Sequence, residues 1–298
     1  MDILDQPTGK TNSQSRSIEE VIRDGYEFRF GDYLSEMFNL FGRTFGFLMG
    51  HSGIMVASYL IMYIILLMFF FSVIFGGVFD LASQQDPAVF LESMLWKFIA
   101  IWLIVMAYVV GWVLPFRAGT YTFLMTGRET RKYQFSDFFI AMKTKWAKIV
   151  GLTLIIHLLA FGILFLTYYL WLSSIADTVS SLQNNRFDRD LNPFFMFEGL
   201  GWIFLSYIPL IFILISASLS VPLLLFKTDS VIDALVSSMK IVIKKWFYFF
   251  GLFVLVYILT IAGIFVCVVG FLATMHFFPL VIFAIYEDIF IKQGNQSV

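Results

Sequence analysis

Residues 246–286 read WFYFFGLFVLVYILTIAGIFVCVVGFLATMHFFPLVIFAIY and contain no Asp, Glu, Lys or Arg. As a single helix this run would be roughly 60 Å long, about twice the hydrocarbon thickness of a bilayer. It therefore predicts a helical hairpin of two membrane spans, with a turn at Gly270. Four further uncharged runs each predict one span and cover residues 44–79, 98–116, 149–176 and 199–226.

The sequence thus predicts an all-α integral membrane protein with six transmembrane helices. The spans are expected near residues 54–75, 96–116, 149–171, 201–226, 246–267 and 270–289. Helices are favoured because backbone groups in lipid must be hydrogen-bonded within their own segment. The composition agrees, since 59% of residues are hydrophobic, 14% are charged and the mean hydropathy is +0.84. These values exclude an ordinary soluble enzyme, and the net charge of −1 gives no reason to expect nucleic acid.

Basic residues are concentrated on one side of the predicted bundle. Most Lys and Arg lie before span one, between spans two and three, and between spans four and five. Because basic residues in short loops favour the cytoplasm, both termini are expected to be cytoplasmic. Residues 1–29 are expected to form a largely disordered cytoplasmic tail, residues 30–290 a single transmembrane domain, and residues 291–298 a short cytoplasmic tail.

The sequence indicates one unit repeated three times, over about residues 30–116, 135–226 and 231–290. Each unit is expected to begin with a cytoplasmic amphipathic interfacial helix and to continue as a hairpin of two spans. The lysines of the second and third amphipathic segments are candidates for contact with anionic lipid head groups. They are Lys143, Lys145, Lys148, Lys240, Lys244 and Lys245. The alternative interpretation is a cytoplasmic elbow that packs against the bundle.

Each even-numbered span contains a proline, which is Pro115, Pro222 or Pro279. A proline frees a backbone carbonyl and kinks a helix. Interrupted helices in repeated positions are typical of transporter binding sites. A structural kink is the interpretation we favour, because no charged residue lies near the middle of these spans.

His157 and His276 are candidate intramembrane polar groups. A metal or haem site would need further ligands at matching depth, so we expect interhelical hydrogen bonds and no catalytic residue, metal or cofactor. Gly42, Gly46 and Gly50 are spaced by four and predict a helix-packing face. This face would serve contact within the bundle or a homodimer, and the alternative is a flexible junction before span one.

Three stretches of the sequence carry a resemblance to a known family. They are YEFRFGDYLSEMFNLFGRTFGFLM at 26–49, VIDALVSSMKIVIKKW at 231–246 and FPLVIFAIYEDIF at 278–290, which has an A-x-Y-x-D signature at Ala284, Tyr286 and Asp288. The pattern resembles the YciC-like six-span proteins and the membrane domain attached to some glycerophosphodiester phosphodiesterases. The resemblance implies a multi-pass protein of the bacterial cytoplasmic (inner) membrane without an assigned reaction.

Two functional hypotheses lead, ahead of a third in which a membrane enzyme holds a cofactor through His157 and His276. The first is a non-enzymatic membrane protein that organises membrane lipids or partner proteins, with a protein partner or a homo-oligomer as a further expectation. Repeated amphipathic segments and the lack of an acid–base constellation favour it. The alternative is a transporter or permease-like exporter of a hydrophobic or amphiphilic small molecule, which the repeats and the prolines favour.

Overall fold

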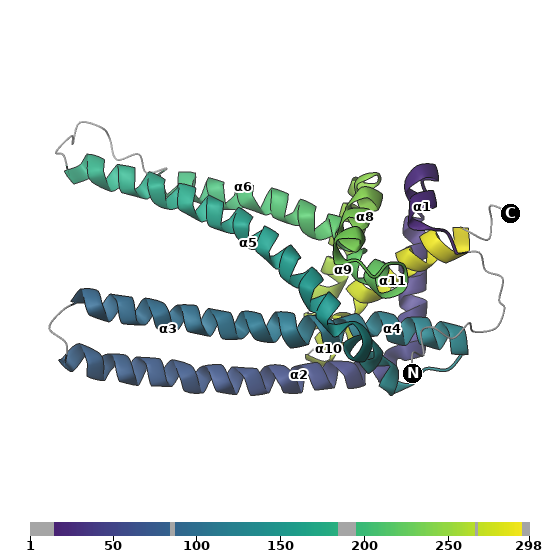
Figure 1. The fold of residues 1–298 in the computed structure, drawn as a ribbon, viewed down its shortest axis with the longest axis horizontal. Helices are drawn as coiled ribbons and strands as arrows, with labels where there is room; N and C mark the ends of the chain where they lie inside the picture. The colour runs from purple at the N-terminus through teal and green to yellow at the C-terminus, as the bar shows by residue number, and fades with distance from the viewer. Residues whose placement is uncertain (1–14, 84–86, 184–194, 266–267, 294–298) are drawn as a thin grey trace.

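The computed structural model describes residues 15–83, 87–183, 195–265 and 268–293 (Figure 1). Within these ranges the chain is helical and contains no strand. Six helices are long and apolar enough to cross a membrane. They are Phe30–Phe71, Ile99–Thr130, Phe135–Thr167, Tyr207–Phe226, Trp246–Phe265 and Gly270–Lys292. The prediction of an all-α multi-pass membrane protein with six spans is confirmed.

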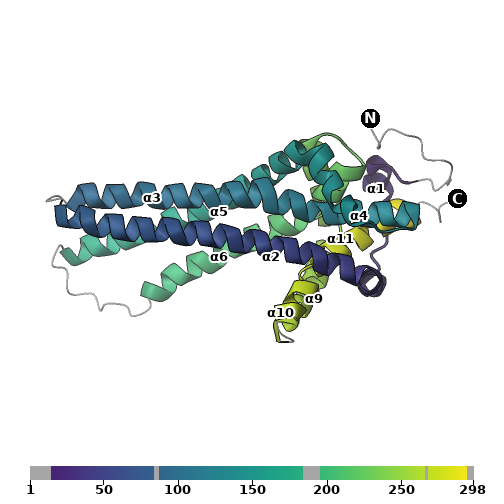
Figure 2. The ribbon, with the colours of Figure 1, turned by 90° about the horizontal axis from the view of Figure 1, so that it is seen from below.

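The first part of the chain forms a long helical hairpin. A short helix, α1 (Ile18–Asp24), precedes the long helix α2 (Phe30–Ser83), and α3 (Pro87–Tyr108) returns beside α2 (Figure 1). A π-helical turn (Val109–Val113) then carries the chain directly into α4 (Leu114–Thr130). Figure 2 shows the two arms of this hairpin side by side over most of their length.

The helix α1 differs from the expectation of a largely disordered tail. Ser17 and Glu20 form a capping box, in which Ser17 Oγ accepts from the Glu20 N–H at 3.1 Å and the Glu20 carboxylate accepts from the Ser17 N–H at 2.8 Å. Val21 is fully buried in the core. The segment is therefore ordered by its own capping residues and by the burial of one apolar side chain.

The second hairpin begins with a 3-10 turn (Phe135–Phe139) and consists of α5 (Ile140–Gln183) and α6 (Phe195–Ser216). The backbone of α5 is not helical at Lys145, where φ is −129° and ψ is 19°, so the helix is kinked there. A turn separates α6 from the short helix α7 (Ser220–Phe226).

The third hairpin is shorter than the other two. The helix α8 (Val231–Ile243) leads into α9 (Trp246–Phe265) and α10 (Val268–Thr274). The chain then continues through α11 (Phe277–Glu287) into a final π-helical turn (Asp288–Lys292). In Figure 2, α9 and α10 run in a direction of their own, away from the two long hairpins.

The turn predicted at Gly270 is wrong, because this residue lies inside α10. Its carbonyl oxygen faces Gly263 of α9, where an added Cβ would lie only 2.8 Å away. Thr274 Oγ1 donates to the carbonyl oxygen of Thr260 at 3.0 Å across the same contact. Gly263 therefore has no side chain because α9 and α10 pack closely, and Gly270 does not reverse the chain.

Only one of the three expected amphipathic segments is a separate helix. This is α8, which is capped by Ser230, whose Oγ accepts a hydrogen bond from the Asp233 N–H at 3.2 Å. The first segment is the beginning of α2, which continues into the span without interruption. The second is divided between the 3-10 turn and the start of α5.

The buried core lies at the end of the molecule where the three hairpins meet. The helices that follow the prolines, α4, α7 and α11, are lined with buried residues. Large side chains that are fully buried in this core include Tyr33, Phe123, Phe138, Phe249 and Tyr286. The core therefore joins helices from all three units.

The long hairpins have the opposite character. In α2 the side chains of Leu60, Ile61, Tyr63, Ile64 and Ile65 are all exposed, although successive helix positions point in different directions. An apolar surface around most of a helix is typical of a membrane span. The arms therefore expose a broad apolar surface that the protein itself does not cover.

Candidate functional site

Each predicted proline lies in the first turn of a helix that enters the core. Pro115, Pro222 and Pro279 are near the starts of α4, α7 and α11, and all three are buried. The helix is disturbed directly before each of them, by a π-helical turn before α4 and by short turns before α7 and α11. Proline is tolerated in a first helical turn because it needs no N–H donor there. The prolines therefore mark where each exposed arm becomes a buried core helix.

A tryptophan from the second unit donates a hydrogen bond to the backbone carbonyl that the interruption before α4 leaves free. Pro115 has no N–H to donate to the carbonyl oxygen of Gly111, four residues earlier. Instead the indole Nε1 of Trp146 in α5 donates to this oxygen at 2.8 Å.

At the other two interruptions, serine side chains form hydrogen bonds with the backbone groups. Ser238 of α8 donates to the carbonyl oxygen of Ser216 at 2.7 Å and accepts from the Leu219 N–H at 3.1 Å, so it joins α6 to α7. Ser52 of α2 donates to the carbonyl oxygen of Leu272 in α10 at 2.8 Å. In each case the bridging side chain belongs to a different unit from the helix that it repairs.

The structure brings His276 next to His51, and not next to His157. His276 Nε2 lies 2.8 Å from Ser52 Oγ, and because that hydroxyl donates to a carbonyl, the histidine donates to Ser52. The two histidine rings are 5.1 Å apart. His157 Nδ1 lies 2.8 Å from the carbonyl oxygen of Thr153 in its own helix.

His51 is enclosed by aromatic rings. Its imidazole stacks on Phe116 at 4.2 Å and on Phe138 at 4.4 Å, and its Nε2 lies 3.2 Å from the Phe116 carbonyl oxygen. Within the described parts of the chain, no three His, Cys, Asp or Glu residues are grouped so that they could hold a metal ion. The described arrangement offers hydrogen bonding between helices and no ligand set for a metal.

Two adjacent acidic residues at the end of α11 form a polar cluster that sequence reasoning missed. Asp288 accepts hydrogen bonds from Tyr33 Oη at 2.9 Å and from Gln293 Nε2 at 2.7 Å. Glu287 pairs with Arg128 of α4 at 2.9 Å. The A-x-Y-x-D signature therefore places its aspartate between the start of α2 and the last described residues. The sequence does show two acidic residues directly after an uncharged run, but it does not show their partners, which are distant in the chain.

Of the six lysines predicted to contact head groups, four bind within the protein. Lys145 donates to the carbonyl oxygens of Leu224 and Leu225 at 2.9 and 3.2 Å. Lys145 and Lys148 both pair with Asp229, and their ammonium groups hold the pKa of that carboxyl below its usual range.

The third unit uses its lysines differently. Lys244 donates to the carbonyl oxygen of Ile22 in α1, and the ammonium of Lys245 lies 5.7 Å from the centre of the Tyr248 ring. Lys143 and Lys240 are exposed and make no hydrogen bond or ion pair with any described residue. Contact with lipid head groups therefore stays a prediction for these two lysines.

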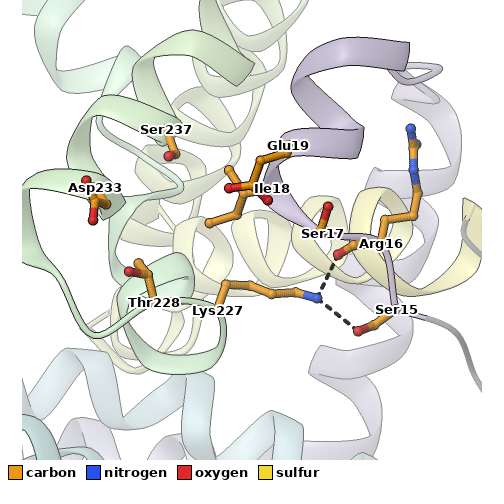
Figure 3. A pocket seen from close by; sticks show the side chains of 9 residues that line it. All are labelled: Ser15, Arg16, Ser17, Ile18, Glu19, Lys227, Thr228, Asp233 and Ser237. Atoms are coloured by element: carbon orange, nitrogen blue, oxygen red, sulfur yellow. Dashed lines mark hydrogen bonds between the residues drawn. The ribbon is translucent and has the colours of Figure 1, made fainter.

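A cavity of about 480 Å³ opens between α1, the end of α7 and α8 (Figure 3). It is lined by Ser15, Arg16, Ser17, Ile18, Glu19, Lys227, Thr228, Asp233 and Ser237. Lys227 Nζ donates to Ser15 Oγ at 3.0 Å and to the Arg16 carbonyl oxygen at 2.9 Å, and burial lowers the pKa of this lysine. Lys227 therefore fastens the segment before α1 to the end of α7.

The predicted glycine face is only partly in contact with the chain itself. An added Cβ on Gly50 would lie 3.1 Å from the ring of Phe135. Gly42 and Gly46 face open space, and α2 continues through all three as a regular helix. Gly50 thus serves contact within the bundle, and the other two leave an open strip on α2.

The comparisons with known proteins returned no match. No family model matches the chain, and no curated protein and no solved structure is similar enough to count as a relative.

Proposed function

We propose that the protein is a non-enzymatic multi-pass membrane protein that organises lipids around its hairpins. The observation that supports this proposal is the division of the molecule into a packed core and arms with exposed apolar side chains. Removing one large apolar side chain from water is favourable by about 1.5–3 kcal/mol. The arms therefore present a large surface whose natural contact is the acyl chains of lipids.

We place the protein in the bacterial inner membrane, with both described chain ends on the cytoplasmic side. The Arg16 N–H donates to the Phe290 carbonyl oxygen at 2.9 Å, so the two described ends lie together at the core. Trp112 and Trp146 are exposed near the junction of arms and core, as expected of tryptophans at a membrane interface. The resemblance to the YciC-like proteins supports this placement.

We also propose that the three units arose from one repeated unit. The support is the recurrence of a disturbed helix, a buried proline and a core helix in each unit, with a bridge from a neighbouring unit. The open strip at Gly42 and Gly46 is the surface that a protein partner or a second copy would use.

The experiment that tests lipid organisation is extraction from native membranes with a polymer that keeps surrounding lipid, followed by lipid mass spectrometry. We expect one lipid class to be enriched over its share of the bulk membrane. The proposal fails if the retained lipids match the bulk composition and deletion leaves lipid composition and envelope integrity unchanged.

The second candidate is a transporter or exporter of a hydrophobic or amphiphilic small molecule. The observation that favours it is the interruption of α3–α4, α6–α7 and α10–α11 at corresponding places. Flux of amphiphilic dyes into proteoliposomes separates the two candidates. Transport predicts protein-dependent uptake, whereas lipid organisation predicts the same uptake as empty liposomes.

A further inference from the structure

Arg117 of α4 is a cation in a helix that crosses the membrane. It follows directly after the uncharged run 98–116 and lies within the span Ile99–Thr130. Its side chain is half-buried, and it makes no hydrogen bond or ion pair with any described residue. Arg29 and Arg128 have carboxylate partners, since they lie 3.0 Å from Glu27 and 2.9 Å from Glu287.

The groups around Arg117 do not neutralise its charge. The side chains that interact with it electrostatically include His51, Tyr59, Tyr121 and His276, and none of these is a carboxylate. An arginine in a membrane span is costly unless it reaches an anion or water. The half-buried guanidinium therefore needs an anion or water, and no described carboxylate is paired with it.

Unpaired polar atoms lie beside the same place. Thr120, three residues after Arg117 and thus on a neighbouring part of the helix face, is fully buried and its hydroxyl has no partner. His51 Nδ1 is also buried without a partner. Buried polar atoms that are left unpaired in this way indicate water or ligand oxygens that complete the site.

The depth of Arg117 matches that of lipid phosphates. Trp112 stacks on Phe116 at 5.8 Å and is 37% exposed, and Trp146 binds the carbonyl oxygen of Gly111 nearby. Tryptophans favour the interface between head groups and acyl chains. We propose that Arg117 binds the phosphate of an acidic phospholipid where α4 leaves the bilayer, an inference that rests on the proposed function. An acidic lipid is favoured over a zwitterionic one because it brings no ammonium of its own to compete with the guanidinium.

The test is native mass spectrometry of the whole protein in micelles that contain phosphatidylglycerol or phosphatidylcholine. Arg117→Gln should weaken the binding of phosphatidylglycerol by about tenfold, as expected for the loss of one charge-assisted contact. Arg43→Gln is the matched control, because Arg43 is an exposed arginine of α2 with no hydrogen bond or ion pair to a described residue. This control should bind as the wild type does.

The outcomes separate the site from the wider proposal. If Arg117→Gln binds phosphatidylglycerol as the wild type does, the site is wrong while lipid organisation stands. If the wild type retains no phospholipid at all, both are wrong. If Arg117→Gln does not fold, Arg117→Lys takes its place and Arg43→Lys becomes the control. The proposed site predicts that Arg117→Lys binds phosphatidylglycerol more weakly than both the wild type and Arg43→Lys. Equal binding by these proteins would overturn the site.

Discussion

Gly119 is the position where the packing of the core is most sharply testable. A Cβ on this residue of α4 would overlap the carbonyl oxygen of Phe138 and lie 2.9 Å from its carbonyl carbon. The same approach allows Thr122 Oγ1 to donate to the Asp137 carbonyl oxygen at 2.9 Å. Gly119→Ala must therefore push α4 away from the 3-10 turn at the start of the second hairpin.

The expected cost is about 3 kcal/mol, at the upper end of the range for overpacking, because the obstacle is backbone and cannot rotate away. Alanine gives back roughly 0.5–1 kcal/mol through its higher helix propensity. Gly251→Ala in α9 is the matched control, since an added Cβ there meets nothing within 4 Å. It shares the gain in propensity without the clash, so the difference between the variants isolates the clash.

The assay is reversible unfolding in mixed micelles by titration with a denaturing detergent, followed by circular dichroism. Gly119→Ala should unfold at a clearly lower detergent fraction than the wild type, and Gly251→Ala at the same or a slightly higher one. Equal stability of the two variants would refute the close contact of α4 with the 3-10 turn.

Three further predictions use the same assay. Trp146→Phe leaves the Gly111 carbonyl oxygen without its donor and should destabilise the fold by about 1 kcal/mol. Unchanged stability would show that this hydrogen bond does not stabilise the protein. Ser238→Ala leaves two buried backbone groups unpaired and should cost about 1–3 kcal/mol, whereas Ser237→Ala should cost little. Asp229→Asn tests a pH effect. Because two lysines lower the folded-state pKa of Asp229, its stabilisation is present above a pH of about 4 and is lost as the pH falls through the folded-state value. The difference in stability between the wild type and Asp229→Asn should be small, since the Asp229 side chain is exposed. This difference should disappear in acid and at high salt.

The number of spans was predictable because the exclusion of charge from lipid is a local property of the sequence. The helix ends were not, because α2 and α4 extend past their uncharged runs into the buried core. The charge at Arg117 ends the uncharged run 98–116, yet α4 continues to Thr130, and Arg128 near its end pairs with Glu287. Such a pair joins residues far apart in the chain, which a single sequence does not reveal.

The candidate site was partly predictable for a related reason. The prolines were singled out from the sequence, but the hydrogen-bond donors at each interruption come from neighbouring units and depend on helix contacts. His276 was predicted to be an intramembrane polar group, whereas its partner Ser52 has no distinguishing pattern. The capping box at Ser17 and Glu20 was a readable signal for α1 that the expectation of a disordered tail overlooked.

The most direct test of the account asks whether the arms lie in lipid. Spin labels would be placed at Ile61 of α2 and Leu158 of α5, which are 62% and 60% exposed, and at the exposed Glu19 of α1 as the aqueous control, all in a Cys267→Ser background. In reconstituted bilayers, relaxation by oxygen should be strong at the two arm positions and relaxation by a water-soluble nickel chelate should be strong only at Glu19. Strong relaxation by the nickel chelate at Ile61 and Leu158 would contradict the account.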